Sequence, residues 1–148
     1  MAYKTVQIKN YSNIREELVA AGTITPGMVV ELASATTVQA HSTQNGNVLA
    51  MVAVEDELQG KIISEDYSAT DQVQCWVPNK GDIGYCILAS GQNVSAGEFL
   101  SSNGDGRLKT TPDPTSAGGD EYPAQVVGVA VTAVNASGAA ARIQVRFI

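Results

Sequence analysis

The sequence predicts an all-β fold: a small sandwich-like or barrel-like domain built from two related β-hairpin units, with an extended N-terminal arm and at most one short helix. Three observations predict it. Apolar, β-branched runs too short for core helices recur along the chain, separated by Gly, Ser, Thr and Asn. The C-terminal run alternates apolar and polar residues with the period of a strand. A weak internal repeat marks two copies of a glycine-punctuated unit.

Size and charge limit the classes of function. The 148 residues are 44% hydrophobic and 16% charged, which fits one compact domain with its own core. The net charge of -6 produces a negative field, which repels nucleic-acid phosphates and anionic lipid. The start lacks the apolar core of a signal peptide, and no apolar stretch approaches the roughly 18 residues that span a bilayer. We therefore expect a soluble protein made in a cytoplasm, with no nucleic-acid or membrane partner.

We expect residues 1–22 to form an N-terminal arm, followed by a β-rich domain over residues 23–148. Tyr3, Val6, Ile8 and Tyr11 place apolar side chains on an otherwise polar segment. Exposed apolar side chains of this kind need a partner. Two interpretations stay open: an arm that contacts another chain, or an edge strand of the chain's own sheet.

One segment, residues 14–20, has helix signals. Asn13 is a candidate N-cap, Glu16 completes a capping box three residues later, and Gly22 is a candidate stop. These signals predict a helix of one or two turns.

The internal repeat is the main organisational signal. Gly27 follows Ile24 by three residues, and Gly97 follows Val94 at the same spacing. Each glycine permits a positive φ between strands, and a short apolar strand follows it. The pattern predicts two related hairpin units packed as a sandwich or barrel. Each copy ends in an apolar return strand, LAMVAVED (49–56) in the first and VVGVAVTAV (126–134) in the second.

The C-terminal part of the chain contains a predicted loop, an apolar run and a predicted last strand. Residues 109–123 are rich in Pro and Gly and predict an exposed loop, either an interaction loop or a simple connection. Residues 126–134 are almost continuously apolar, and their β-branching favours a strand over a helix, although periodicity alone leaves both open. Ile143, Val145 and Phe147 predict the buried face of a last strand.

The two cysteines flank a run of turn residues. Cys75 and Cys86 enclose WVPNKGDIGY, which predicts a hairpin with the two thiols roughly facing each other. A reducing cytoplasm favours free, buried thiols over a structural disulfide.

The residue types show no catalytic signature. A single histidine, His41, serves neither a Ser-His-Asp triad nor, with two cysteines, a zinc site. We therefore expect no enzyme activity, no metal and no cofactor. Two alternatives stay open: a carbohydrate-binding or tail-associated module, and, least supported, an enzyme that uses His41 with a cysteine. In the first, the stacking platforms would be Trp76, Tyr85 and Tyr122.

Several motifs occur in a fixed order along the chain. Over roughly residues 22–148 they resemble the head decoration, or capsid cement, proteins of tailed bacteriophages. The most specific stretches are AVEDELQGK (53–61) and G-x-x-V-x-x-G-x-x-L-x-S-x-G-D-G-x-L (91–108). The other motifs are I-T-P-G-M-x-V-E-L (24–32), Y-S-A-T-D-Q-V (67–73), and the closing V-G-V-A-V and R-I-Q-V.

This resemblance implies a homotrimer on the outside of an expanded icosahedral head. It would sit at three-fold or quasi-three-fold positions, bind the major capsid protein and bridge neighbouring subunits against the pressure of packed DNA. The location implied is the exterior of the virion, after synthesis in the host cytoplasm. Tyr3, Val6, Ile8 and Tyr11 are then candidates for capsid or inter-subunit contacts.

Overall fold

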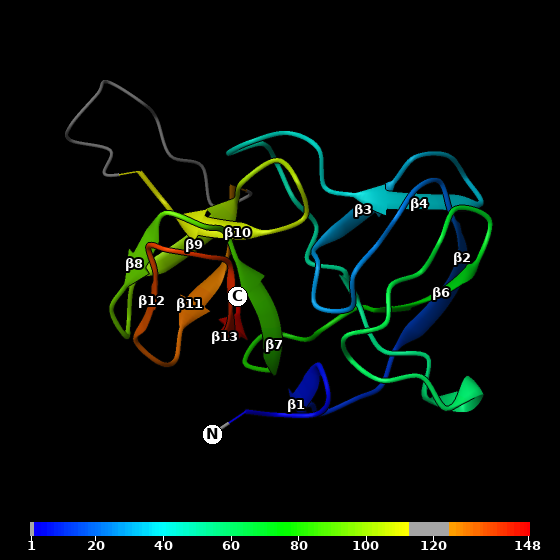
Figure 1. The fold of residues 1–148 in the computed structure, drawn as a ribbon, viewed down its shortest axis with the longest axis horizontal. Helices are drawn as coiled ribbons and strands as arrows, with labels where there is room; N and C mark the ends of the chain where they lie inside the picture. The colour runs from blue at the N-terminus through cyan, green and yellow to red at the C-terminus, as the bar shows by residue number, and fades with distance from the viewer. Residues whose placement is uncertain (1, 113–124) are drawn as a thin grey trace.

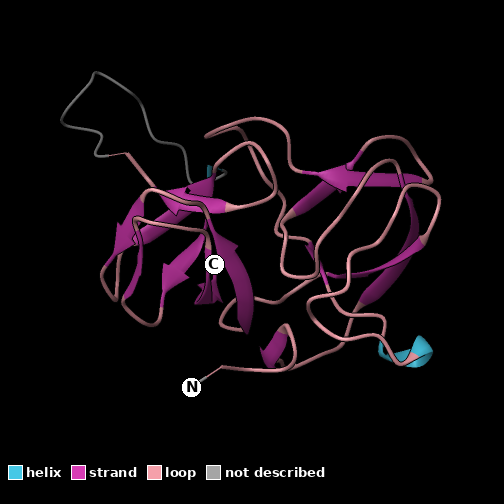
Figure 2. Cartoon of the chain, in the orientation of Figure 1, coloured by secondary structure: helices cyan, strands magenta, loops and turns pink. Residues whose placement is uncertain are grey.

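Two five-stranded barrels lie side by side (Figure 1), and the regular structure is almost entirely strand (Figure 2). The structure, a computed structural model, describes residues 2–112 and 125–148. The all-β prediction is confirmed. The N-terminal barrel contains β2 (Arg15–Ala20), β3 (Val30–Leu32), β4 (Thr37–Ala40), β5 (Val52–Ala53) and β6 (Gln72–Trp76). The C-terminal barrel contains β7 (Ile83–Leu88), β9 (Phe99–Ser102), β10 (Leu108–Thr110), β11 (Val126–Ala130) and β13 (Ala141–Phe147). The remaining elements are β1 (Gln7–Lys9), a pair of strands β8 (Gln92–Val94) and β12 (Val134–Ala136), and a 3-10 turn η1 (Glu57–Gln59).

Both barrels have the same strand order. The N-terminal sheet runs β3-β4-β2-β6-β5, and a bridge between Val29 and Val52 closes it. Read around the barrel from its first strand, the order is β2-β4-β3-β5-β6. The C-terminal sheet has six strands in the order β1-β7-β10-β9-β11-β13, and the pairing of β7 with β13 closes the last five of them into a barrel, with β1 attached to the edge of β7. In each barrel the first strand is parallel to the third, β2 to β4 and β7 to β10, and the other pairs are antiparallel. The chain therefore contains one five-strand unit twice.

The repeat predicted from the glycines is confirmed by equivalent backbone hydrogen bonds. The Gly27 N–H donates to Ala53 O at 2.7 Å, and the Gly97 N–H donates to Ala130 O at 2.8 Å. Both glycines have positive φ, 99° and 92°, where a side chain would be strained. Ile24, three residues before Gly27, bridges Tyr67, as Val94 pairs with Val134.

The predicted helix over residues 14–20 is wrong: this segment is strand β2. Asn13 does not cap a helix, because its Oδ1 accepts side-chain hydrogen bonds from Gln7 and Arg15. β2 instead pairs along its length with β6, from Arg15 opposite Trp76 to Val19 opposite Gln72, and its end pairs with β4. Pairing with strands distant in sequence overrides the local helix signals.

The predicted cysteine hairpin is also wrong, because its two strands belong to different barrels. β6 pairs with β2 and β5, whereas β7 pairs with β1, β10 and β13. Cys75 lies in the core of the N-terminal barrel and Cys86 in that of the C-terminal barrel. Both thiols are free, which confirms the free-thiol prediction and excludes the intramolecular disulfide in this fold.

Residues 2–22 are built into both barrels. β1 pairs with the first half of β7, next to the stretch of that strand that β10 leaves free. Val6, just before β1, is fully buried: its N–H donates to Glu55 Oε2 at 3.1 Å, and its carbonyl accepts from the Tyr85 N–H at 2.8 Å. Since Glu55 belongs to the N-terminal unit and Tyr85 to the C-terminal one, the segment around Val6 connects the two barrels by hydrogen bonds.

The C-terminal strands follow their predictions. Ile143, Val145 and Phe147 are buried on one face of β13, and β11 occupies most of the apolar run over residues 126–134. Of the predicted loop over residues 109–123, positions 109 and 110 belong to β10, and positions 113–123 lie outside the described residues. In the described parts of the chain, no helix has the length and apolar character to cross a membrane.

The interface between the barrels is apolar and centred on Trp76. Trp76 is fully buried and meets Phe147 edge to face, with ring centroids 5.5 Å apart. Although it belongs to β6, it packs in the core cluster of the C-terminal barrel rather than with its neighbour Cys75. Three further side chains of the N-terminal unit do the same, namely Val29, Val52 and Val54.

Gly84→Ala tests this interface. A Cβ at Gly84 would lie 2.7 Å from Phe147 Cε2 and 3.1 Å from Trp76 Cζ3, so two packed rings must shift. We expect a loss of about 1–3 kcal/mol in the free energy of unfolding, measured by denaturant titration. Gly138→Ala is the matched control, because a Cβ there meets no atom within 4 Å, and it should change the free energy by less than about 0.5 kcal/mol. Equal effects of the two substitutions would contradict the assignment.

Candidate interaction surfaces

The two cysteines are placed as core residues. Burial raises the pKa of Cys75 to about 12, with the Glu16 carboxylate adding to the rise. Burial also raises the pKa of Cys86 to about 12, against the opposing charge of Arg142. A thiol nucleophile reacts as the thiolate, which neither site favours at neutral pH.

His41 is buried in a hydrogen-bond network that joins the barrels. Its Nδ1 lies 2.7 Å from Ser102 Oγ, and its Nε2 lies 3.0 Å from the carbonyl oxygen of Asn47. Because a carbonyl only accepts, Nε2 donates to the Asn47 oxygen, and in the neutral form of the ring Nδ1 accepts from the Ser102 hydroxyl. Ser102 Oγ in turn accepts from the Gly104 N–H at 3.1 Å.

The same network contains the three residue types of a catalytic triad, but its serine is inaccessible. Glu31 Oε2 lies 3.5 Å from His41 Nε2, so a serine, a histidine and a carboxylate stand in line. Ser102 is fully buried in β9, however, so a substrate carbonyl has no path to its Oγ. Partial burial opposes ionisation of Glu31, but hydrogen bonds from Ser42 and Gln39 and the nearby His41 outweigh it and lower the pKa of its carboxyl. We read the network as a structural link between β4 and β9.

Trp76 cannot provide a stacking platform for the carbohydrate-binding alternative, because it is fully buried in the inter-barrel core. Tyr85 is half-buried and packs edge to face against Tyr3, with ring centroids 5.4 Å apart. Tyr122 lies outside the described residues.

The four predicted contact residues have different surroundings. Val6 is buried inside its own chain and has no surface for a partner. Tyr3 packs on Tyr85, and Ile8 is half-buried on β1. Tyr11 alone of the four is largely free, with 90% of its side chain exposed. A contact with another molecule therefore stays a prediction, and it concerns mainly Tyr11.

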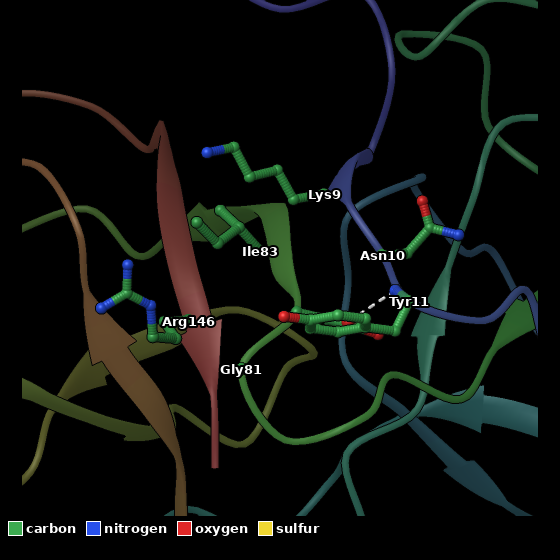
Figure 3. A pocket seen from close by; sticks show the side chains of 7 residues that line it. Lys9, Asn10, Tyr11, Gly81, Ile83 and Arg146 are labelled. Atoms are coloured by element: carbon green, nitrogen blue, oxygen red, sulfur yellow. Dashed lines mark hydrogen bonds between the residues drawn. The ribbon is translucent and has the colours of Figure 1, made fainter.

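Tyr11 borders an open cavity of about 220 Å³, which we call the Tyr11 pocket (Figure 3). Asp82, buried beneath it, accepts the Tyr11 N–H on Oδ1 at 3.0 Å and the Asn79 N–H on Oδ2 at 2.8 Å. These bonds fix the backbone that carries the exposed ring. The pocket is lined by Lys9, Asn10, Tyr11, Gly81, Asp82, Ile83 and Arg146.

A second surface is apolar, and we call it the Leu49 surface. Leu49, with 78% of its side chain exposed, lies between two hollows of the surface. One hollow borders Glu31, Leu32 and His41. The other is lined wholly by apolar residues: Val48, Leu49, Ala50, Val77, Pro78, Val126 and Ile148. Exposed apolar side chains that gather in this way are typical of protein contacts.

Sequence reasoning missed most residues of both surfaces. Lys9 and Arg146 line the same pocket because β1 and β13 flank β7, and no local pattern shows that pairing. The Leu49 surface combines segments from both barrels and the C-terminus. The one usable signal was the exposed tyrosine in a polar segment, which pointed to Tyr11.

The fold is similar to a protein of a bacteriophage head. The crystal structure of the head fiber gp8.5 N base in bacteriophage phi29 superposes with a TM-score of 0.58, covering 93% of this chain and 95% of that chain. The sequence identity is 12%, so the likeness shows a shared fold. No protein-family model matches the chain, and no curated protein sequence matches it.

The thiols provide a test of the core assignment. With the pKa of each raised from about 9 to about 12, the thiolate fraction at neutral pH falls by a factor on the order of 1,000. We expect both cysteines to react with a chromogenic disulfide reagent very slowly in the folded protein and rapidly after unfolding in denaturant. Fast reaction of either thiol in the folded protein would contradict its burial and reopen the cysteine-enzyme alternative.

Proposed function

We propose that this protein decorates the outer surface of a bacteriophage head as a non-enzymatic structural component without a cofactor. In this proposal, a homotrimer made in the host cytoplasm binds the expanded head and bridges neighbouring major capsid proteins. The observation that carries it is the fold shared with a phage head fiber base over nearly the whole of both chains. The motif resemblance to head decoration proteins supports it independently.

The physical basis of such a role is linkage. A protein that binds the expanded shell more tightly than the unexpanded one lowers the free energy of the expanded state. A trimer on a three-fold position makes the same modest contact three times, so retention comes from avidity rather than from one large interface. The acidic net charge does not oppose this role, because the contacts are with protein.

The Leu49 surface is the shell contact in this proposal. Its apolar hollow of about 540 Å³ is larger than the Tyr11 pocket, and the residues that line it carry no charged side chains. Apolar, charge-poor patches are typical of the buried centres of stable interfaces.

Cosedimentation with phage heads tests the proposal. The wild-type protein should sediment with expanded heads of the phage that encodes it and remain in solution with unexpanded ones. Leu49→Asp should weaken this binding at least tenfold, because a carboxylate would be buried in an apolar contact. Leu58→Asp is the matched control, since Leu58 is 80% exposed on η1 outside the surface. Absence of wild-type binding would overturn the function, and equal loss in both variants would overturn the assignment of the Leu49 surface.

Light scattering over a dilution series tests the trimer separately. We expect a native molar mass three times the chain mass of 15.4 kDa. A monomer at every concentration would leave assembly on the head as the source of three-fold symmetry.

A further inference from the structure

Two basic residues of the C-terminal barrel lie on the two strands that flank β7. Lys9 on β1 and Arg146 on β13 both lie opposite Ile83 on β7. Residues directly opposite each other project from the same face of a sheet, so the two cations flank Ile83 on the outer face. Figure 3 shows this order, with Ile83 between the two basic side chains. With strands about 4.8 Å apart, one carboxylate is within reach of both long side chains.

These cations have no acidic partner among the described residues. The side-chain ion pairs found there involve Arg15 with Glu57, Arg107 with Asp105, and His41 with Glu31. Asp82, the acidic residue among those that line the pocket, accepts hydrogen bonds from backbone N–H groups on both carboxylate oxygens. In a chain with net charge -6, an unpaired basic couple is a local reversal of the field and favours an anionic ligand.

Tyr11 supplies the opposite wall of the pocket. Its ring lies across the cavity below Lys9 and Ile83 and leaves a face open toward them (Figure 3). The hydrogen bond from the Tyr11 N–H to the buried Asp82 fixes the backbone from which the ring projects. An exposed aromatic face binds the apolar face of a sugar ring.

We propose that the Tyr11 pocket binds an acidic sugar, a uronic or sialic acid, with the sugar ring on Tyr11 and the carboxylate between Lys9 and Arg146. Arg146 offers a planar fork of donors that fits a carboxylate, and Lys9 adds a second charge. The Asn10 side chain at the rim adds donors and an acceptor for ring hydroxyls. A cavity of about 220 Å³ matches one sugar ring rather than a longer oligosaccharide. The site is separate from the Leu49 surface and would remain accessible on a docked protein.

Titration with monosaccharides, followed by the backbone amide signals in NMR spectra of the full chain, tests this site. For D-glucuronate we expect a Kd on the order of 1 mM, as the size of a monosaccharide allows. The amide signals of Tyr11 and Gly81 should shift, whereas D-glucose should bind at least tenfold more weakly. Tyr11→Ala and Arg146→Gln should each weaken glucuronate binding at least tenfold. Arg107→Gln, which removes a half-exposed cation paired with Asp105 outside the pocket, should leave it unchanged.

Other ligands define the outcomes that overturn the proposal. Acetate that binds as tightly as glucuronate would show an anion site with no role for the sugar ring. N-acetylneuraminate is titrated in the same way as glucuronate. A short glutamate peptide that binds more tightly than both of these acidic sugars would assign the pocket to a protein partner. Absence of shifts with both acidic sugars at 20 mM, on the order of twenty times the expected Kd, would refute the site. Tyr11→Ala protein that no longer sediments with expanded heads would make the pocket part of the shell contact instead; retained sedimentation keeps this inference separate from the proposed function.

Discussion

The packing of Trp76 between the two barrels is the constraint on which the rest of the structure depends. Each barrel on its own is small, and the second completes its core with side chains contributed by the first. Burial of a tryptophan against Phe147 accounts for several kcal/mol, a large share of what a domain of this size retains after its conformational entropy. Gly84 is required at this point, because a larger residue would meet both rings.

Polar links at the barrel interface depend on that apolar contact. Arg142 reaches across to the carbonyl oxygen of Ile63 at 2.8 Å and lies over the Tyr85 ring, 5.8 Å from its centroid. Burial lowers the pKa of its guanidinium, a sign of the desolvation it bears, yet an arginine stays charged at physiological pH. The bond between Val6 and Glu55 and the network around His41 are likewise formed only when the barrels are docked. These links fix the orientation of two units whose attraction is mainly apolar.

The sequence predicted what is local and missed what is long-range. Gly27 and Gly97 were informative because a positive φ leaves a direct mark on residue choice, and the alternation around Ile143 was informative because a strand has period two. The helix predicted at 14–20 and the hairpin between the cysteines failed for one reason. Local capping and turn signals were present, but β2 pairs with residues more than fifty positions away, and the turn at 77–82 joins two barrels rather than two paired strands. The candidate site was predicted only as far as Tyr11, since its basic residues meet through β7.

Comparison of the two copies explains why the C-terminal barrel has the Tyr11 pocket where the equivalent face of the N-terminal barrel is covered. Trp76 pairs with Arg15 in the first copy, and the equivalent pair in the second copy is Arg146 with Ile83. Trp76 on β6 and Arg146 on β13 are the equivalent residues, and each points outward from its own barrel. In the first copy that face is covered by the second barrel, so an aromatic core residue fits. In the second copy the face is open to solvent, where a charged side chain is favoured and the strand β1 completes the rim. Asymmetric docking of two equivalent units therefore makes one position a core residue and the equivalent position part of the wall of the Tyr11 pocket.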